Sequence, residues 1–149
     1  MTPGRIDIKI VEDRLGIARD CLAALRRLPR TSLEAFLADE RTPDAAESRL
    51  RRAIEALFDT ARHILSKEFG HGALEYRDVA RRAHERGLVA DRALAGRFEQ
   101  IAGYRNRPIH FYDAVTSQEL LNIVRDDLPD LEAIADTLER AALGLAKKP

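Results

Sequence analysis

The residues with the most chemical potential in this chain are gathered between positions 104 and 115, in the stretch YRNRPIHFYDAV. Arg105, Asn106, His110 and Tyr112 fall within it. A guanidinium binds phosphate with two parallel hydrogen bonds, and an imidazole accepts or donates a proton near neutral pH. These groups fit metal-free cleavage of RNA, in which a base helps the ribose 2′-hydroxyl attack its own phosphate. The alternative is the polar start of an ordinary helix, because Arg and His also stand five positions apart in many inert helices.

Pro108 decides how this stretch can fold. Proline is excluded from a helix interior but is tolerated in the first turn. We therefore expect a helix to begin near Asn106 or Arg107, with Arg105 outside it at the N-terminal edge. From there the side chain of Arg105 could turn toward His110, and a helix N-terminus itself favours phosphate.

A second candidate group lies on a long predicted helix. Glu55, Asp59 and His63 follow one another at i, i+4 spacing and form one polar stripe beside the apolar stripe. Such a stripe either lines a cleft or is the solvated side of the helix.

The remaining histidines and the cysteine favour structural roles. His71 stands between two glycines in a predicted loop, and His84 lies on a helix face expected to be exposed, so both are interpreted as surface residues. Cys21 stands next to Leu22 on the first predicted helix and is interpreted as a buried or half-buried small apolar residue. A single cysteine excludes an intrachain disulfide and a cysteine-based zinc cluster.

The elements that must position these residues are helices. Apolar residues recur at steps of three and four over most of the chain, and the composition is poor in the aromatic and β-branched residues of strands. Pro29, Gly70 and Gly87 mark predicted helix ends, and Pro129 should kink or split the last helix near Asp127. We predict an all-α bundle of about five to six helices in a single domain, 1–149. The predicted helices cover residues 6–27, the short segment TSLEAFLAD, about 43–68, 74–86, a segment from an Asp91 N-cap through Ile101, and 121 to about 145.

Two N-caps are predicted before and at the start of the long helix. Thr31 is expected to cap the short helix, with Glu34 at the capping-box position. Thr42 is expected to cap the long helix, with Pro43 at its first helical position.

Composition excludes several classes of function. The 25 basic residues balance 25 acidic ones, which argues against large-scale neutralisation of a nucleic-acid backbone but leaves room for a local RNA site. The N-terminal sequence lacks the pattern of a signal peptide, and no apolar segment approaches the ~20 residues that span a bilayer. A cytoplasmic location is expected.

The stretch RNRPIHFY resembles the R-x4-H-x-Y signature of HEPN-domain proteins, specifically the HepT-type toxins of HEPN/MNT toxin–antitoxin pairs. The resemblance covers nearly the whole chain, from the first amphipathic helix to the last helix broken at DDLPDLEAI. It implies an all-α HEPN fold that forms a homodimer, with the motifs of both subunits facing a shared RNA-cleaving cleft. The implied activity is metal-independent endoribonuclease cleavage, for which no cofactor is expected.

Carried over residue by residue, the resemblance makes Arg105 and His110 the catalytic pair and Asn106 a supporting polar group. Tyr112 is then the residue to which a partner nucleotidyltransferase, the MNT antitoxin, attaches AMP. Asp59 and His63 are implied as candidate residues at the border of the cleft.

Two other interpretations remain open at this stage. The chain could be a non-catalytic HEPN dimer that serves as a binding module or docking partner for a nucleotidyltransferase, which the zero net charge and Pro108 favour. It could also be a purely structural bundle, in which the Arg105–His110 pair would tolerate mutation.

Overall fold

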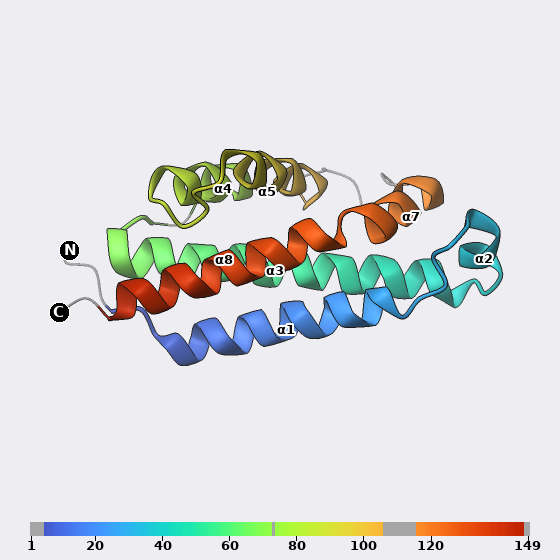
Figure 1. Cartoon of the computed structure of the whole chain (residues 1–149), viewed down its shortest axis with the longest axis horizontal. Helices are drawn as coiled ribbons and strands as arrows, with labels where there is room; N and C mark the ends of the chain where they lie inside the picture. The colour runs from blue at the N-terminus through green and yellow to red at the C-terminus, as the bar shows by residue number, and fades with distance from the viewer. Residues whose placement is uncertain (1–4, 73, 106–115, 148–149) are drawn as a thin grey trace.

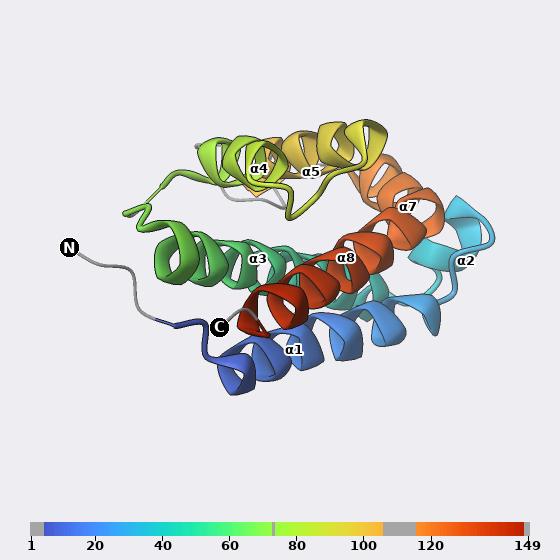
Figure 2. The same cartoon turned by 60° about the vertical axis from the view of Figure 1, so that its left-hand side comes forward.

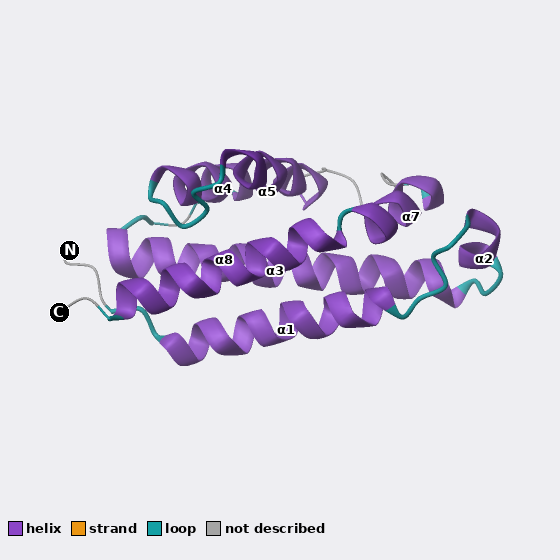
Figure 3. Cartoon of the chain, viewed as in Figure 1, coloured by secondary structure: helices purple, strands orange, loops and turns teal. Residues whose placement is uncertain are grey.

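The computed structural model describes residues 5–72, 74–105 and 116–147, and this part of the chain contains seven helices and no strand (Figures 1 and 3). The prediction of an all-α fold is confirmed. The described helices are one more than the predicted five to six, and the seventh comes from the last predicted helix, which is split at Pro129 as the sequence predicts. The helices are α1 (Ile8–Arg26), α2 (Leu33–Leu37), α3 (Arg41–Phe69), α4 (Tyr76–Glu85), α5 (Arg92–Arg105), α7 (Ser117–Asp126) and α8 (Leu128–Ala146).

The three long helices α1, α3 and α8 lie side by side and enclose most of the core (Figure 1). Helix α1 runs antiparallel to the other two, because its early residues meet the late residues of α3 and α8. The apolar stripes predicted from the sequence face one another here, and Leu15, Leu57 and Ile134 are fully buried. Cys21 is also buried, as predicted.

Helices α4 and α5 form a pair that lies over α3 and α8 (Figure 2). An aromatic stack holds this pair in place. Phe58 of α3 stacks on Tyr76 of α4 with a centroid distance of 4.5 Å, and on Phe98 of α5 with a centroid distance of 4.4 Å. Since Phe58 is fully buried, its ring contributes both a large apolar area and the stacking geometry that aromatic pairs prefer.

The break between α7 and α8 falls where Pro129 predicts it. Asp127 ends α7 and precedes α8, and Pro129 lies in the first turn of α8, where the missing amide hydrogen costs no intrahelical bond. Burial raises the pKa of the Asp127 carboxyl, while the charge of Arg97 opposes that shift.

The short helix is capped one residue later than predicted. Ser32 is the N-cap, and its hydroxyl accepts a hydrogen bond from the amide of Ala35 at 3.1 Å. The capping box of Thr31 and Glu34 is therefore wrong, because with Ser32 at the N-cap the third helical position is Ala35.

The long helix also begins earlier than predicted. Thr42 is not its N-cap but a buried residue inside the first turn. The Asp39 side chain accepts from the amide of Arg41 at 2.9 Å, and the Asp39 carbonyl accepts from the amide of Thr42 at 3.0 Å. This turn leads directly into the helix. Pro43 then stands within the first turn, where its missing donor is tolerated.

Two glycines end helices as predicted. Gly70 follows α3 with φ 70°, and its amide donates to the carbonyl of Ser66 at 3.0 Å. Gly87 follows the end of α4 with φ 78°. Both positions lie in the left-handed region, which favours glycine because it has no Cβ.

Candidate functional site

The motif stretch begins at the C-terminal end of α5. Arg105 is the last residue of that helix, so the prediction that it lies outside a helix, at the N-terminal edge of the next one, is wrong. Helix α5 passes through Gly103 without a break and carries Arg105 with it. Asn106, His110 and Tyr112 lie outside the described residues, and so does Pro108. The pairing of Arg105 with His110 therefore stays a prediction.

The first turn of α4 places the end of α5. The guanidinium of Arg77 lies next to Gly103, with Nη2 at 3.9 Å from the position that a Cβ would occupy there. A Cβ at Gly103 would meet this guanidinium at ordinary van der Waals distance, so the side chain of Arg77 packs against α5 here. Arg77 follows Tyr76, which is part of the stack on Phe58. The beginning of the motif is thus tied through α4 to the middle of α3.

Asp59 and His63, the two predicted cleft-lining residues, do lie together at the surface. They line one hollow of about 420 Å³, which we call the α3 hollow. Its lining residues are Arg14, Asp59, Arg62, His63, Ser66 and Gly72. Glu55, the third member of the predicted stripe, is half-buried and is not among them.

The carboxylate of Asp59 stands between two guanidinium groups. One oxygen is 3.9 Å from Nη1 of Arg14, and the other is 3.7 Å from Nη1 of Arg62. Both distances exceed those of a protein hydrogen bond, about 2.7 to 3.2 Å for N–H···O. About two fifths of each side chain is exposed, so water screens both pairs and each adds little stability.

Arg62 is fixed by contacts on its other side. Its Nε and Nη2 both donate to the carbonyl of Leu74, at 3.0 and 2.7 Å. The guanidinium also lies over the ring of Tyr76, 4.8 Å from the centroid, at a distance typical of a cation–π contact. These contacts leave Nη1 as the nitrogen directed toward Asp59.

His63 is neutral in its described environment. Its Nε2 accepts a hydrogen bond from the backbone amide of Asp7 at 3.0 Å, so the ring proton belongs on Nδ1. Burial lowers the pKa of His63, and the charges of Lys67 and Arg14 lower it further, against the opposing charge of Asp7. The ring serves here as a bonded neutral group with one N–H left to donate.

The other two described histidines differ from the surface role predicted for them. His84 is half-buried, and its Nδ1 is 2.9 Å from the carbonyl of Val89. This bond ties the end of α4 to the loop before α5. His71 is also half-buried and accepts a bond from Nε of Arg86 at 3.3 Å.

Arg14 and Arg62 are site residues that sequence reasoning missed. The i, i+3 spacing of Asp59 and Arg62 was available as a signal, but it also occurs on many solvated helix faces. Nothing in the sequence brings Arg14 to the same place, because its contact with Asp59 joins α1 to α3.

A second hollow, of about 450 Å³, lies between α5 and α8. Arg97 of α5 is 3.6 Å from Asp130 of α8 there, so cations and carboxylates are paired across it. Three carboxylates and two guanidiniums are among its lining residues, which are Asp91, Ala93, Leu94, Arg97, Asp130, Ala133, Asp136, Thr137 and Arg140.

Within the described ranges, no group of three or more His, Cys, Asp or Glu residues is placed to hold a metal ion. No helix in the same ranges is both long and apolar enough to span a membrane.

A bundle of three long helices, with a helix pair laid over it, is the fold of several solved toxin structures. The chain is similar to the tri-AMPylated HEPN toxin of Shewanella oneidensis in complex with MNT antitoxin, with a TM-score of 0.76 and 21% identity over 88% of this chain and 97% of that one. It is also similar to a toxin–antitoxin bound to AMP-PNP, with a TM-score of 0.74 and 21% identity over 89% of this chain and 98% of that one. At this level of identity the likeness shows the fold. No curated protein sequence matches the chain.

The sequence itself matches a family model. Residues 18–138 match the model described as ribonuclease HepT-like, which covers most of the chain. The chain therefore belongs to the HepT-like ribonuclease family, and ribonuclease is its general class of activity. The resemblance noted from RNRPIHFY is confirmed at the level of the family.

Proposed function

We propose that this chain is the toxin of a HEPN/MNT toxin–antitoxin pair and acts as a metal-independent endoribonuclease. Arg105 and His110 are its catalytic residues, and Asn106 is a supporting hydrogen-bond donor. The observation that carries this proposal is the R-x4-H sequence at the end of α5 in a chain that matches the HepT-like ribonuclease model.

In the proposed reaction, the ribose 2′-oxygen attacks the adjacent phosphorus and the bond from phosphorus to the 5′-oxygen breaks. His110 accepts the proton of the 2′-hydroxyl, and the departing 5′-oxygen takes up a proton. Arg105 offers a guanidinium to the phosphate oxygens, where negative charge grows in the transition state. The products are a 2′,3′-cyclic phosphate and a 5′-hydroxyl, and no metal ion enters the reaction.

The active unit of this proposal is a homodimer whose two motifs share one cleft. Its regulator is a nucleotidyltransferase antitoxin, which transfers AMP from ATP to the phenolic oxygen of Tyr112 and releases pyrophosphate. The similar toxin from Shewanella oneidensis is AMPylated and bound to MNT antitoxin, which supports the antitoxin partner and the transfer of AMP. An adenylyl group brings bulk and a negative phosphate beside the motif, and this charge repels an RNA backbone.

The test is cleavage of a labelled RNA by the purified chain in the presence of EDTA. The expected result is cleavage by the wild type, with cyclic phosphate ends identified by mass spectrometry, and no cleavage by His110→Ala. Circular dichroism and size-exclusion chromatography establish that both proteins are folded and have the same oligomeric state. A folded wild-type dimer that leaves RNA intact would contradict the proposal and favour the non-catalytic docking module.

Co-expression with an MNT-type nucleotidyltransferase tests the modification separately. The intact mass of the chain should rise by one or more AMP units, and Tyr112→Phe should abolish the increase. An unchanged increase in Tyr112→Phe would mean that another residue carries the AMP.

A further inference from the structure

The α3 hollow offers many hydrogen-bond donors and few acceptors. The guanidiniums of Arg14 and Arg62, the hydroxyl of Ser66 and the ring of His63, whose Nε2 accepts from the Asp7 amide and whose proton therefore belongs on Nδ1, all belong to its lining. Among the described lining residues, Asp59 is the only carboxylate. A site with this balance suits an anion with several oxygen acceptors, such as a phosphate.

The single carboxylate does not saturate the cations. Asp59 is 3.9 Å from Arg14 and 3.7 Å from Arg62, so it makes no hydrogen bond to either group. Nε of Arg14 is buried and has no hydrogen-bond partner within the described part of the chain. One positive charge is therefore left over between these three side chains.

The donor of Arg62 is preorganised. The carbonyl of Leu74 and the ring of Tyr76 hold its guanidinium in place and leave Nη1 on the side of the hollow. An anion that binds there does not have to order a long, mobile side chain, so binding loses less conformational entropy.

A chain of side-chain contacts links the hollow to the end of α5, where the proposed motif begins. Arg62 contacts the ring of Tyr76, and the next residue, Arg77, places its guanidinium beside Gly103. Gly103 stands two residues before Arg105 in α5. The first turn of α4 thus joins the hollow to the end of α5, and it carries a further exposed cation, Arg77, between the two.

We propose that the α3 hollow binds a phosphodiester group of the RNA substrate, beside the phosphate that is cleaved, with Arg14 and Arg62 as positioning residues. This inference rests on the proposed ribonuclease function and extends its RNA site from the motif onto α1 and α3. Arg77 continues the same cationic surface toward the motif.

The experiment measures binding of a fluorescent single-stranded RNA by anisotropy at a series of salt concentrations. The His110→Ala variant serves as the background, so that the RNA is not cut. Arg14→Gln and Arg62→Gln, each added to this background, should weaken binding about fivefold or more. Each should also reduce the slope of log affinity against log salt by about 0.7, the value for one phosphate contact to a single strand.

Two further variants separate recognition from folding. Asp59→Asn removes the carboxylate and should strengthen RNA binding, a change in a direction that damage to the fold does not produce. Arg140→Gln is the matched control. It removes a more exposed arginine that lines the hollow between α5 and α8 and whose only described hydrogen bond is a 3.5 Å contact with Thr137, and it should change neither affinity nor slope.

The outcomes separate this inference from the ribonuclease proposal. If the wild type cleaves RNA while Arg14→Gln and Arg62→Gln bind like Arg140→Gln, the phosphate site is wrong and the ribonuclease proposal stands. If the background binds no RNA and the wild type cleaves none, both fail. Binding of ATP or inorganic phosphate that depends on Arg14 and Arg62, without such dependence for RNA, would assign the hollow to a free phosphate and overturn the RNA site.

Discussion

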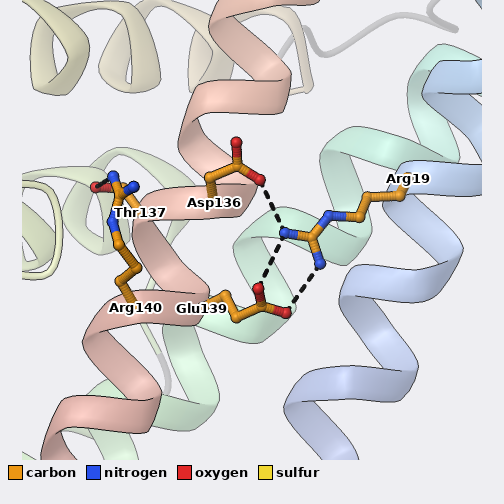
Figure 4. Close-up of polar contacts among 5 residues, drawn as sticks. All are labelled: Arg19, Asp136, Thr137, Glu139 and Arg140. Atoms are coloured by element: carbon orange, nitrogen blue, oxygen red, sulfur yellow. Dashed lines mark hydrogen bonds and ion pairs between the residues drawn. The ribbon is translucent and has the colours of Figure 1, made fainter.

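Two clusters of arginine and carboxylate on this molecule use the same groups in opposite proportions. Between α1 and α8, Arg19 meets two carboxylates, with Nη1 at 3.0 Å from Glu139 and Nη2 at 2.9 Å from Asp136 (Figure 4). In the α3 hollow, two arginines share the single carboxylate of Asp59 at longer range. The first cluster is saturated and ties two helices together, whereas the second keeps unsatisfied donors.

The difference shows which charge clusters are able to bind a ligand. The hydrogen bond to Glu139 is the largest of the contacts that raise the pKa of Arg19, and the two carboxylates bonded to its guanidinium would repel an anion. At the α3 hollow, burial lowers the pKa of His63, and the positive charges of Lys67 and of Arg14, which lines the hollow, lower it further. Four predictions follow from this contrast, in order of expected effect.

The largest loss of stability is expected from Phe58→Ala. The aromatic stack of Phe58 on Tyr76 and Phe98 also supports the α3 hollow, through the contact of Tyr76 with Arg62, and has no such link to the Arg19 cluster. The substitution removes a fully buried ring and should lower the free energy of unfolding by about 3 to 5 kcal/mol. Urea unfolding measures this loss, and hydrogen exchange should show that protection falls most in α4 and α5. Phe58→Leu should cost less, and equal losses of protection in α1 and α8 would contradict the assigned role of the stack.

Arg19→Gln should affect stability and leave RNA binding alone. It leaves Asp136 and Glu139 without their partner, but all three side chains are more than a third exposed, so solvent screening limits the loss to about 0.5 to 1 kcal/mol. Thermal unfolding at low and high salt measures it, and the loss should shrink at high salt. A fivefold change in RNA affinity would show that Arg19 belongs to a binding surface, and it would contradict the purely structural role assigned to the Arg19 cluster.

The third prediction concerns pH. The folded pKa of His63 lies below its ordinary value of 6.5, so between the two values the unfolded chain binds more protons than the folded one. The contribution of His63 to stability is therefore present above pH 6.5 and is lost as pH falls through this window.

The charged groups that act on His63 are Asp7, Arg14 and Lys67, and Asp59 lines the same hollow. Urea unfolding at a series of pH values should give a steeper decline below pH 6.5 for the wild type than for His63→Gln, which does not titrate. Parallel profiles for the two proteins would show that His63 has no shifted pKa.

The smallest effect on stability is expected from Arg14→Met. This substitution removes a buried Nε that lacks a partner among the described residues and keeps an unbranched side chain in its place. The free energy of unfolding should stay within about 0.5 kcal/mol of the wild type or rise slightly, in contrast to Arg19→Gln. A loss larger than that of Arg19→Gln would mean that the pairing of Arg14 with Asp59 stabilises the fold after all.

Helix positions were predictable where one local rule acts alone. Pro129 split the last helix, and Gly70 and Gly87 ended two others, because a missing amide hydrogen and a left-handed backbone limit what the chain can do at those residues. The predicted caps at Thr31 and Thr42 were wrong, because several neighbouring polar side chains can each serve as a cap. The structure uses Ser32 for α2 and the Asp39 turn before α3.

The residues of the candidate site also fall into those that local sequence predicts and those that it does not. Arg105, Asn106, His110 and Tyr112 are predicted from a contiguous sequence signature and remain predictions, whereas Asp59 and His63 share one helix face, which periodicity reveals. Arg14 and the Leu74 carbonyl were not predictable, since they reach Asp59 and Arg62 from other segments of the chain.

The sequence by itself determined the helical fold, the break at Pro129 and the family, because apolar spacing, proline and a short motif are local properties of the chain. Only the tertiary structure decided that Arg105 ends α5, that Phe58 joins three helices and that Asp59 is shared by two arginines. The electrostatic character of a cluster depends on the ratio of charges brought together in space. This chain has equal numbers of basic and acidic residues, so its composition favours neither sign of charge. The packing of the helices alone therefore decides at which places basic groups outnumber acidic ones.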